Sequence, residues 1–206
     1  MMKKVGIVNY RMGNLDSVAR AVEECGGHAV VTSSGSDLEK VSYIILPGVG
    51  SFAAGMENIR RFDLDKILVE QVVEKGIPFL GICLGMQLLA EKGYEGVETD
   101  GLGWFEAEVK RLKPSGAHER IPHVGWNDVI WNQNSPLFRD IPSGKDFYFV
   151  HSYHMICRND GDAIAFTPYC GQFVSAVNKD YIFGVQFHPE KSQKPGFQVI
   201  KNFMEL

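Results

Sequence analysis

The stretch from Pro78 to Leu89 places a single cysteine at the junction of a predicted strand and a predicted helix. An apolar run over residues 78–82 predicts a buried strand, and the helical spacing that follows predicts a helix from Gly85 to Lys92. A strand that turns into a helix within one residue leaves no room for side chains beside the turn, which explains the glycines at 81 and 85. Such a corner exposes the sulfur of Cys83, and a helix N-terminus favours the thiolate form of a cysteine.

Buried strands alternate with amphipathic helices along the first part of the chain. Asn14 can cap the first helix, and Gly26 ends it. The predicted strands cover residues 5–8, 29–32, 43–46 and 78–82, and helical patterns begin at Leu15 and cover 55–60 and 63–75. This alternation predicts an α/β fold: a three-layer, doubly wound, mostly parallel sheet of the flavodoxin-like type, which binds ligands at the carboxyl ends of its strands.

After Lys92 the chain becomes rich in glycine and aromatic residues, with short extended segments. Residues 106–112 and 128–131 are interpreted as antiparallel strands added to the edge of the sheet. Further strands are predicted at 146–153, 163–167, 173–178 and 181–187, the last two as a hairpin, and a closing helix from Gly196. The 206 residues are expected to form a single domain, 1–206.

Charge and cysteine usage exclude several classes of protein. The formal net charge of -4 shows no basic surplus, so nucleic acid is not expected as a partner. The apolar run from Val5 to Val8 is too short for a signal sequence or a membrane span. The four cysteines are scattered without C-x-x-C spacing, so neither a zinc site nor a disulfide framework is indicated, and a reduced, cytoplasmic location is expected.

The loop after the third predicted strand, Pro47 to Phe52, contains two glycines two positions apart. Glycines let a backbone approach a ligand and turn an N–H group toward it. The loop lacks the lysine and the spacing of a phosphate-binding loop. A plain turn remains one interpretation, and an oxyanion hole shared with the corner at Cys83 is the other.

The strand ending at Phe187 runs into His188-Pro189-Glu190. Residues two apart in an extended segment point to the same side, so Glu190 can reach the imidazole of His188 and leave its other nitrogen free as a base. Taken alone, this segment also fits a surface turn, and Cys83 alone also fits a small buried hydrophobic residue. Together they predict a Cys-His-Glu triad for nucleophilic catalysis, whereas a metal site would lack a fourth ligand.

These residues resemble the class I, or triad, glutamine amidotransferases, and most of all the glutaminase subunits of imidazole glycerol phosphate synthases. The blocks that carry the resemblance are Val8 to Tyr10, Gly13 to Leu15, Pro47 to Phe52, Gly81 to Leu89, His123 to Asn127, Phe147 to Tyr153 and Gly184 to Ser192. The resemblance implies that Cys83, His188 and Glu190 hydrolyse glutamine without a cofactor. It further implies an oxyanion hole from Val49, Gly50 and Leu84, and glutamine contacts from Gly48, Gln87, Ser152 and Tyr153.

The resemblance also implies a partner. Ammonia released into water is mostly protonated at pH 7, so it must pass directly to a second site, and 206 residues leave no room for a synthase domain. In the family the partner is a (β/α)8-barrel cyclase, which forms a heterodimer and uses the ammonia for histidine biosynthesis. The partner-facing positions of the family fall on Asn14, Trp126, Tyr148 and Lys191.

Three alternatives stay open on the sequence. Segments outside the shared blocks, at 154–157, 169–171 and 193–195, resemble a branch of the same subunit that supplies ammonia for surface-polysaccharide sugar synthesis. A cysteine hydrolase or protease of the same sheet type would also place a cysteine on a strand-to-helix corner. From a different class, the chain could be a catalytically silent interaction subunit, against which the intact triad argues.

Overall fold

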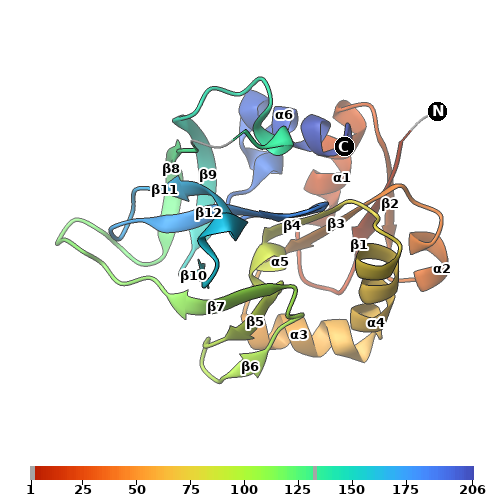
Figure 1. The fold of residues 1–206 in the computed structure, drawn as a ribbon, viewed down its shortest axis with the longest axis horizontal. Helices are drawn as coiled ribbons and strands as arrows, with labels where there is room; N and C mark the ends of the chain where they lie inside the picture. Colours follow the sequence, from red (N-terminus) through yellow and green to blue (C-terminus); the bar gives the residue numbers. More distant parts are fainter. Residues whose placement is uncertain (1–2, 132–133) are drawn as a thin grey trace.

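A seven-stranded sheet forms the centre of the computed structural model, which describes residues 3–131 and 134–206 (Figure 1). In spatial order its strands are β11 (Ala163–Thr167), β12 (Phe173–Lys179), β13 (Ile182–Val185), β4 (Phe79–Cys83), β3 (Tyr43–Gly48), β1 (Lys4–Val8) and β2 (His28–Thr32). Strands β13, β4, β3, β1 and β2 pair in parallel, and β11 and β12 add an antiparallel edge. The predicted mostly parallel sheet with antiparallel edge strands is confirmed, as is the hairpin of β12 and β13.

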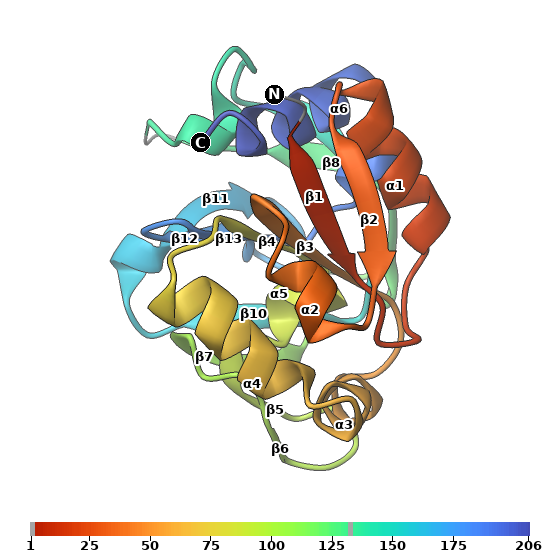
Figure 2. The same cartoon turned by 90° about the vertical axis from the view of Figure 1, so that its right-hand side faces the viewer.

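Helices cover both faces of this sheet, so the fold has three layers (Figure 2). The helices are α1 (Leu15–Glu24), α2 (Gly35–Leu38), α3 (Phe52–Arg61), α4 (Leu64–Leu68), α5 (Leu84–Gln87) and α6 (Gln193–Phe203). Helices α1 and α6 pack with one core, which contains Val22 and Phe203, and α3 and α4 pack with another, which contains Met56 and Leu68. Asn14 caps α1 as predicted, accepting a hydrogen bond from the backbone of Ser17.

Short helical segments complete the chain. A π-helical segment, Val69–Glu74, continues α4, so the helical pattern predicted over 63–75 changes its winding halfway. Three 3-10 turns follow at Pro136–Phe138, Asp160–Asp162 and Pro189–Lys191. Within the described residues, no helix combines the length and the apolar character needed to cross a membrane.

Two small sheets stand beside the central one. One contains β10 (Tyr153–Cys157), β7 (Phe105–Arg111), β5 (Ala90–Gly93) and β6 (Thr99–Asp100), and the other pairs β8 (His123–Val129) with β9 (Lys145–His151). The prediction that 106–112 extends the edge of the central sheet is therefore wrong. The segment 128–131 reaches that edge only at Ile130, which forms an antiparallel bridge with Phe166 of β11 through two backbone hydrogen bonds of 2.8 Å. The central sheet ends at β11 and β2, and β7 pairs instead with β5, the strand that follows the corner at Cys83.

The helix after Cys83 is shorter than its sequence pattern predicts. It ends at Gln87 rather than Lys92, and residues 90–93 form β5. The carbonyl groups of Leu88 and Leu89 accept hydrogen bonds from Leu102, Trp104 and Phe105 instead of continuing a helical ladder. Pairing with distant segments thus outweighs the local helical preference.

Candidate active site

Cys83 ends strand β4 and begins α5 in a strained backbone conformation, with φ 54° and ψ -109°. Its neighbours in space leave no room for larger residues. A Cβ atom on Gly85 would lie 1.8 Å from the carbonyl oxygen of Leu46, and one on Gly81 would lie 2.7 Å from the carbonyl oxygen of Gly85. The steric explanation of the two glycines is confirmed, and the strain is of the kind that functional corners hold.

Replacing Gly85 by alanine is expected to destabilise the protein by about 3 kcal/mol, because the carbonyl oxygen it meets belongs to a central strand and cannot move aside. Gly116→Ala is the matched control, since its Cβ would meet nothing within 4 Å. Urea unfolding of both variants gives the comparison. Equal midpoints for Gly85→Ala and Gly116→Ala would contradict the steric argument.

His188 follows β13, the parallel neighbour of β4. His188 and Cys83 therefore lie at the carboxyl ends of neighbouring strands. Strand β9 holds this turn in place. The backbone N–H of His188 donates to the carbonyl of Tyr148 at 2.9 Å. The buried hydroxyl of Ser192 accepts from the N–H of Tyr148 at 3.0 Å and donates to the carbonyl of His188 at 2.6 Å. Ser192 therefore fixes the turn that carries the histidine.

Glu190 orients the imidazole of His188. Its Oε1 lies 2.8 Å from Nδ1 of the ring, and both side chains are almost completely buried. Burial alone would lower the pKa of His188, but the adjacent Cys83 and then Glu190 raise it to about 10. Nε2 of the ring has no other hydrogen-bond partner among the described residues, so it is free to exchange a proton with the sulfur of Cys83.

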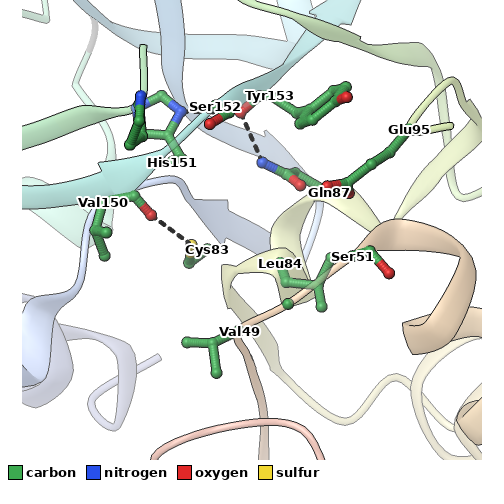
Figure 3. Close-up of a pocket in the computed structure, with 12 residues that line it drawn as sticks. Val49, Ser51, Cys83, Leu84, Gln87, Glu95, Val150, His151, Ser152 and Tyr153 are labelled. Carbon is green, nitrogen blue, oxygen red and sulfur yellow. Dashed lines mark hydrogen bonds between the residues drawn. The ribbon is translucent and has the colours of Figure 1, made fainter. Parts of the chain in front are cut away.

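A cavity of about 480 Å³ opens on one side of Cys83 (Figure 3). Its lining includes six of the residues predicted for the oxyanion hole and the glutamine contacts, namely Val49, Gly50, Leu84, Gln87, Ser152 and Tyr153. Gly48 lies beside them, because it pairs with Cys83 in the ladder between β3 and β4. His188 and Glu190 are not part of the lining.

Sequence reasoning missed three polar residues around this cavity. Glu95 lines it from the loop after β5, and its carboxylate accepts from the backbone N–H of Phe52 at 2.8 Å. His151 lines it from the end of β9, and Gln186 donates to the sulfur of Cys83 at 3.6 Å. Gln186 lies two residues before His188, and this spacing could have predicted that both side chains point to the same side. No motif near Glu95 in the sequence indicates a role for that residue.

Three of the four residues predicted to face a partner lie together. The rings of Trp126 and Tyr148 are 6.0 Å apart, and Nζ of Lys191 lies 5.7 Å from the centre of the Tyr148 ring. Trp126 is 47% exposed, so it is not a core residue. Asn14 is also exposed, at the start of α1 beyond the carboxyl end of β1.

The sequence over residues 7–206 matches the family model described as glutamine amidotransferase class-I. The chain belongs to the class-I glutamine amidotransferases. The family acts on glutamine, which agrees with a cysteine and a histidine meeting beside a cavity whose lining includes Gln87 and Glu95. The amidotransferase is therefore an enzyme, and the alternative of a catalytically silent interaction subunit loses its basis.

Curated relatives resemble the amidotransferase over almost its whole length. A protein of Campylobacter jejuni (strain RM1221) named imidazole glycerol phosphate synthase subunit HisH 1 is 42% identical over 202 residues, covering 98% of this chain and 100% of that protein. The subunit HisH of Moorella thermoacetica is 43% identical over 205 residues, covering 100% of this chain and 96% of its own.

Solved structures with little sequence similarity share the fold. The structure of PurLQS from Thermotoga maritima contains a chain with a TM-score of 0.77 at 19% identity, covering 100% of this chain and 99% of that one. The crystal structure of a glutamine amidotransferase from Thermotoga maritima has a TM-score of 0.68 at 21% identity, covering 92% of this chain and 77% of that one.

Proposed function

We propose that this amidotransferase is the glutaminase subunit of an imidazole glycerol phosphate synthase. The observation that carries the chemistry is the buried pair of His188 and Glu190 beside Cys83, which itself lines the cavity. The names of relatives about 40% identical over nearly the full chain support the choice of synthase.

In the proposed reaction the sulfur of Cys83 attacks the carbon of the glutamine side-chain amide. A C–S bond forms, and the electron pair of the C=O bond moves to the oxygen, where backbone N–H groups of Leu84 and of Val49 or Gly50 would hold it. His188 then gives its proton to the nitrogen as the C–N bond breaks and ammonia leaves. Water hydrolyses the resulting thioester to glutamate and restores the thiol.

The cavity offers a polar group for each end of glutamine. Gln87, Ser152 and Tyr153, which we propose contact glutamine, line the cavity, and Gly48 pairs with Cys83 beside it. Glu95 places a carboxylate in the same cavity, and its charge is complementary to the α-ammonium group of an amino acid. The cavity therefore suits a small zwitterion with an amide side chain.

The ammonia needs a second active site, which we assign to a (β/α)8-barrel cyclase subunit in a heterodimer. The relatives are named as synthase subunits, which supports a partner. The surface that we propose for docking contains exposed Trp126, with Tyr148 and Lys191 beside it. It also includes Asn14, beyond the carboxyl end of β1. We further propose a cytoplasmic location, where the four free cysteines would stay reduced.

Amide-labelled glutamine tests this proposal directly. The chain is incubated with the cyclase subunit of the same organism and the ribulosyl formimino nucleotide that the cyclase uses. We expect the ¹⁵N label in the imidazole glycerol phosphate product, with one glutamate formed per product. Cys83→Ala in the same mixture controls for free ammonia. Glutamate formed without labelled product would contradict the histidine-pathway assignment and retain only the glutaminase.

A second candidate function differs only in the acceptor. The segments at 154–157, 169–171 and 193–195 resemble a branch that supplies ammonia for surface-polysaccharide sugar synthesis. In that case the label would enter a nitrogen-containing sugar made by a different partner.

A further inference from the structure

A partly buried hydrogen bond joins the wall of the glutamine cavity to a histidine that the proposed reaction does not use. Nδ1 of His151 lies 2.9 Å from the carbonyl oxygen of Tyr153. A carbonyl oxygen only accepts, so Nδ1 carries the hydrogen. Burial lowers the pKa of His151 to about 3, so the ring is neutral and its Nε2 is an acceptor.

The next member of the chain is His123, which faces His151 across the β8–β9 ladder. Nδ1 of His123 lies 3.1 Å from Nε2 of His151, so it must donate, and Nε2 of His123 must accept. Asn127 supplies that hydrogen from Nδ2 at 3.2 Å, while its Oδ1 accepts from the backbone of Asp128. Burial lowers the pKa of His123 to about 4, which keeps this ring neutral too.

At the other end, the carbonyl of Tyr153 also accepts from the side-chain amide of Gln87 at 2.8 Å. The same amide nitrogen donates to Oε1 of Gln186 at 2.9 Å, and Gln186 donates to the sulfur of Cys83 at 3.6 Å. Both hydrogens of the Gln87 amide are therefore used, and its Oε1 is the atom left to meet a ligand in the cavity. Figure 3 shows Gln87 and His151 on either side of the Tyr153 carbonyl.

We propose that His123 and His151 are positioning residues for glutamine. Both rings are neutral Nδ1–H imidazoles, and the hydrogen bonds run in one direction, from Asn127 through His123 and His151 to the carbonyl of Tyr153. They fix this carbonyl and, through it, the orientation of Gln87. This inference rests on the proposed function, because it assigns the cavity to glutamine. Each donor and acceptor in the chain has one possible role, so a tautomer change at either ring would break two hydrogen bonds. This series of hydrogen bonds thereby holds the Oε1 of Gln87 toward the substrate and the amide of Gln186 toward Cys83.

Two substitutions of His151 separate this role from simple packing. Asparagine can place an N–H group where Nδ1 stands, whereas leucine cannot donate to the Tyr153 carbonyl. We expect His151→Leu to raise KM for glutamine about tenfold with kcat changed less than about threefold, the pattern for lost ground-state binding, and His151→Asn to recover most of the loss. Val199→Ala lies in the core on helix α6, so it controls for lost stability without disturbing the hydrogen bonds between Asn127 and Tyr153.

A spectroscopic measurement reports the tautomers directly. ¹⁵N chemical shifts of the histidine side chains at pH 7 should show both rings as neutral Nδ1–H forms, and His123→Leu should release His151 into a mixture of tautomers. An Nε2–H form in either wild-type ring would overturn the inference, as would an unchanged KM in His151→Leu. Kinetics are measured on the complex with the cyclase subunit. If the wild-type complex did not hydrolyse glutamine at all, the proposed function and this inference would both fall; wild-type turnover with an unchanged KM in the leucine variant would overturn the positioning role alone.

Discussion

Cys83→Ala is expected to abolish glutamate production, with a loss in kcat on the order of 10⁶, because the reaction would lose the atom that forms the covalent intermediate. The measurement is glutamate release in the complex with the cyclase subunit, compared with the wild type. The small side chain still fits the corner, so the variant should fold normally. Glutamate production that stays within a few fold of wild type would refute the assignment of Cys83 as the nucleophile.

The other three cysteines give the matched control. Burial raises the pKa of the thiols of Cys25 and Cys170, and it raises that of Cys157 to about 12, so all three remain protonated at neutral pH. A diazo-ketone analogue of glutamine should therefore alkylate Cys83 alone, and Cys157→Ala should keep full activity. Peptide mapping by mass spectrometry locates the label. A label on any of the other thiols would contradict the claim that the corner at the end of β4 makes Cys83 the nucleophile.

The nucleophile and its histidine could be predicted because their geometry is local. The corner at Cys83 depends on glycines two residues away, and the pairing of His188 with Glu190 depends on an extended turn fixed by Pro189. Both motifs end strands of one parallel sheet, so strand alternation predicts that they share an edge. The parallel strands, the β12–β13 hairpin and the cap on the first helix were predictable for the same reason, whereas the pairing of β7 was not.

The far wall of the cavity could not be predicted in this way. Glu95 and His151 reach it through the two small sheets, whose pairing depends on contacts between distant segments. The same long-range pairing ends the helix at Gln87, where local periodicity predicts a helix that continues to Lys92. Gln186 was within reach of sequence reasoning, because a side chain two positions before His188 lies on the same side of the extended segment.

Glu190→Gln is expected to reduce kcat by about 10³- to 10⁴-fold, because the neutral amide no longer stabilises the imidazolium form of His188. The substitution keeps the shape of the side chain. However, the second oxygen of Glu190 is buried without a partner among the described residues, so an NH₂ group there would also lack an acceptor. Most of the loss should appear in kcat, since Glu190 does not line the cavity that holds glutamine.

The pH profile separates this electrostatic role from packing. In the wild type, Cys83 and Glu190 hold the pKa of His188 at about 10, so the proton that it gives to the leaving nitrogen is retained well above neutral pH. Without the carboxylate the ring loses this proton at a lower pH, so the alkaline limb of kcat/KM should move toward neutrality. Glu205→Gln makes the same chemical change in an exposed ion pair with Arg139 and should leave the profile unchanged. Because a packing defect would lower activity equally at all pH values, a reduced but unshifted profile would show that Glu190 acts by shape and not by charge.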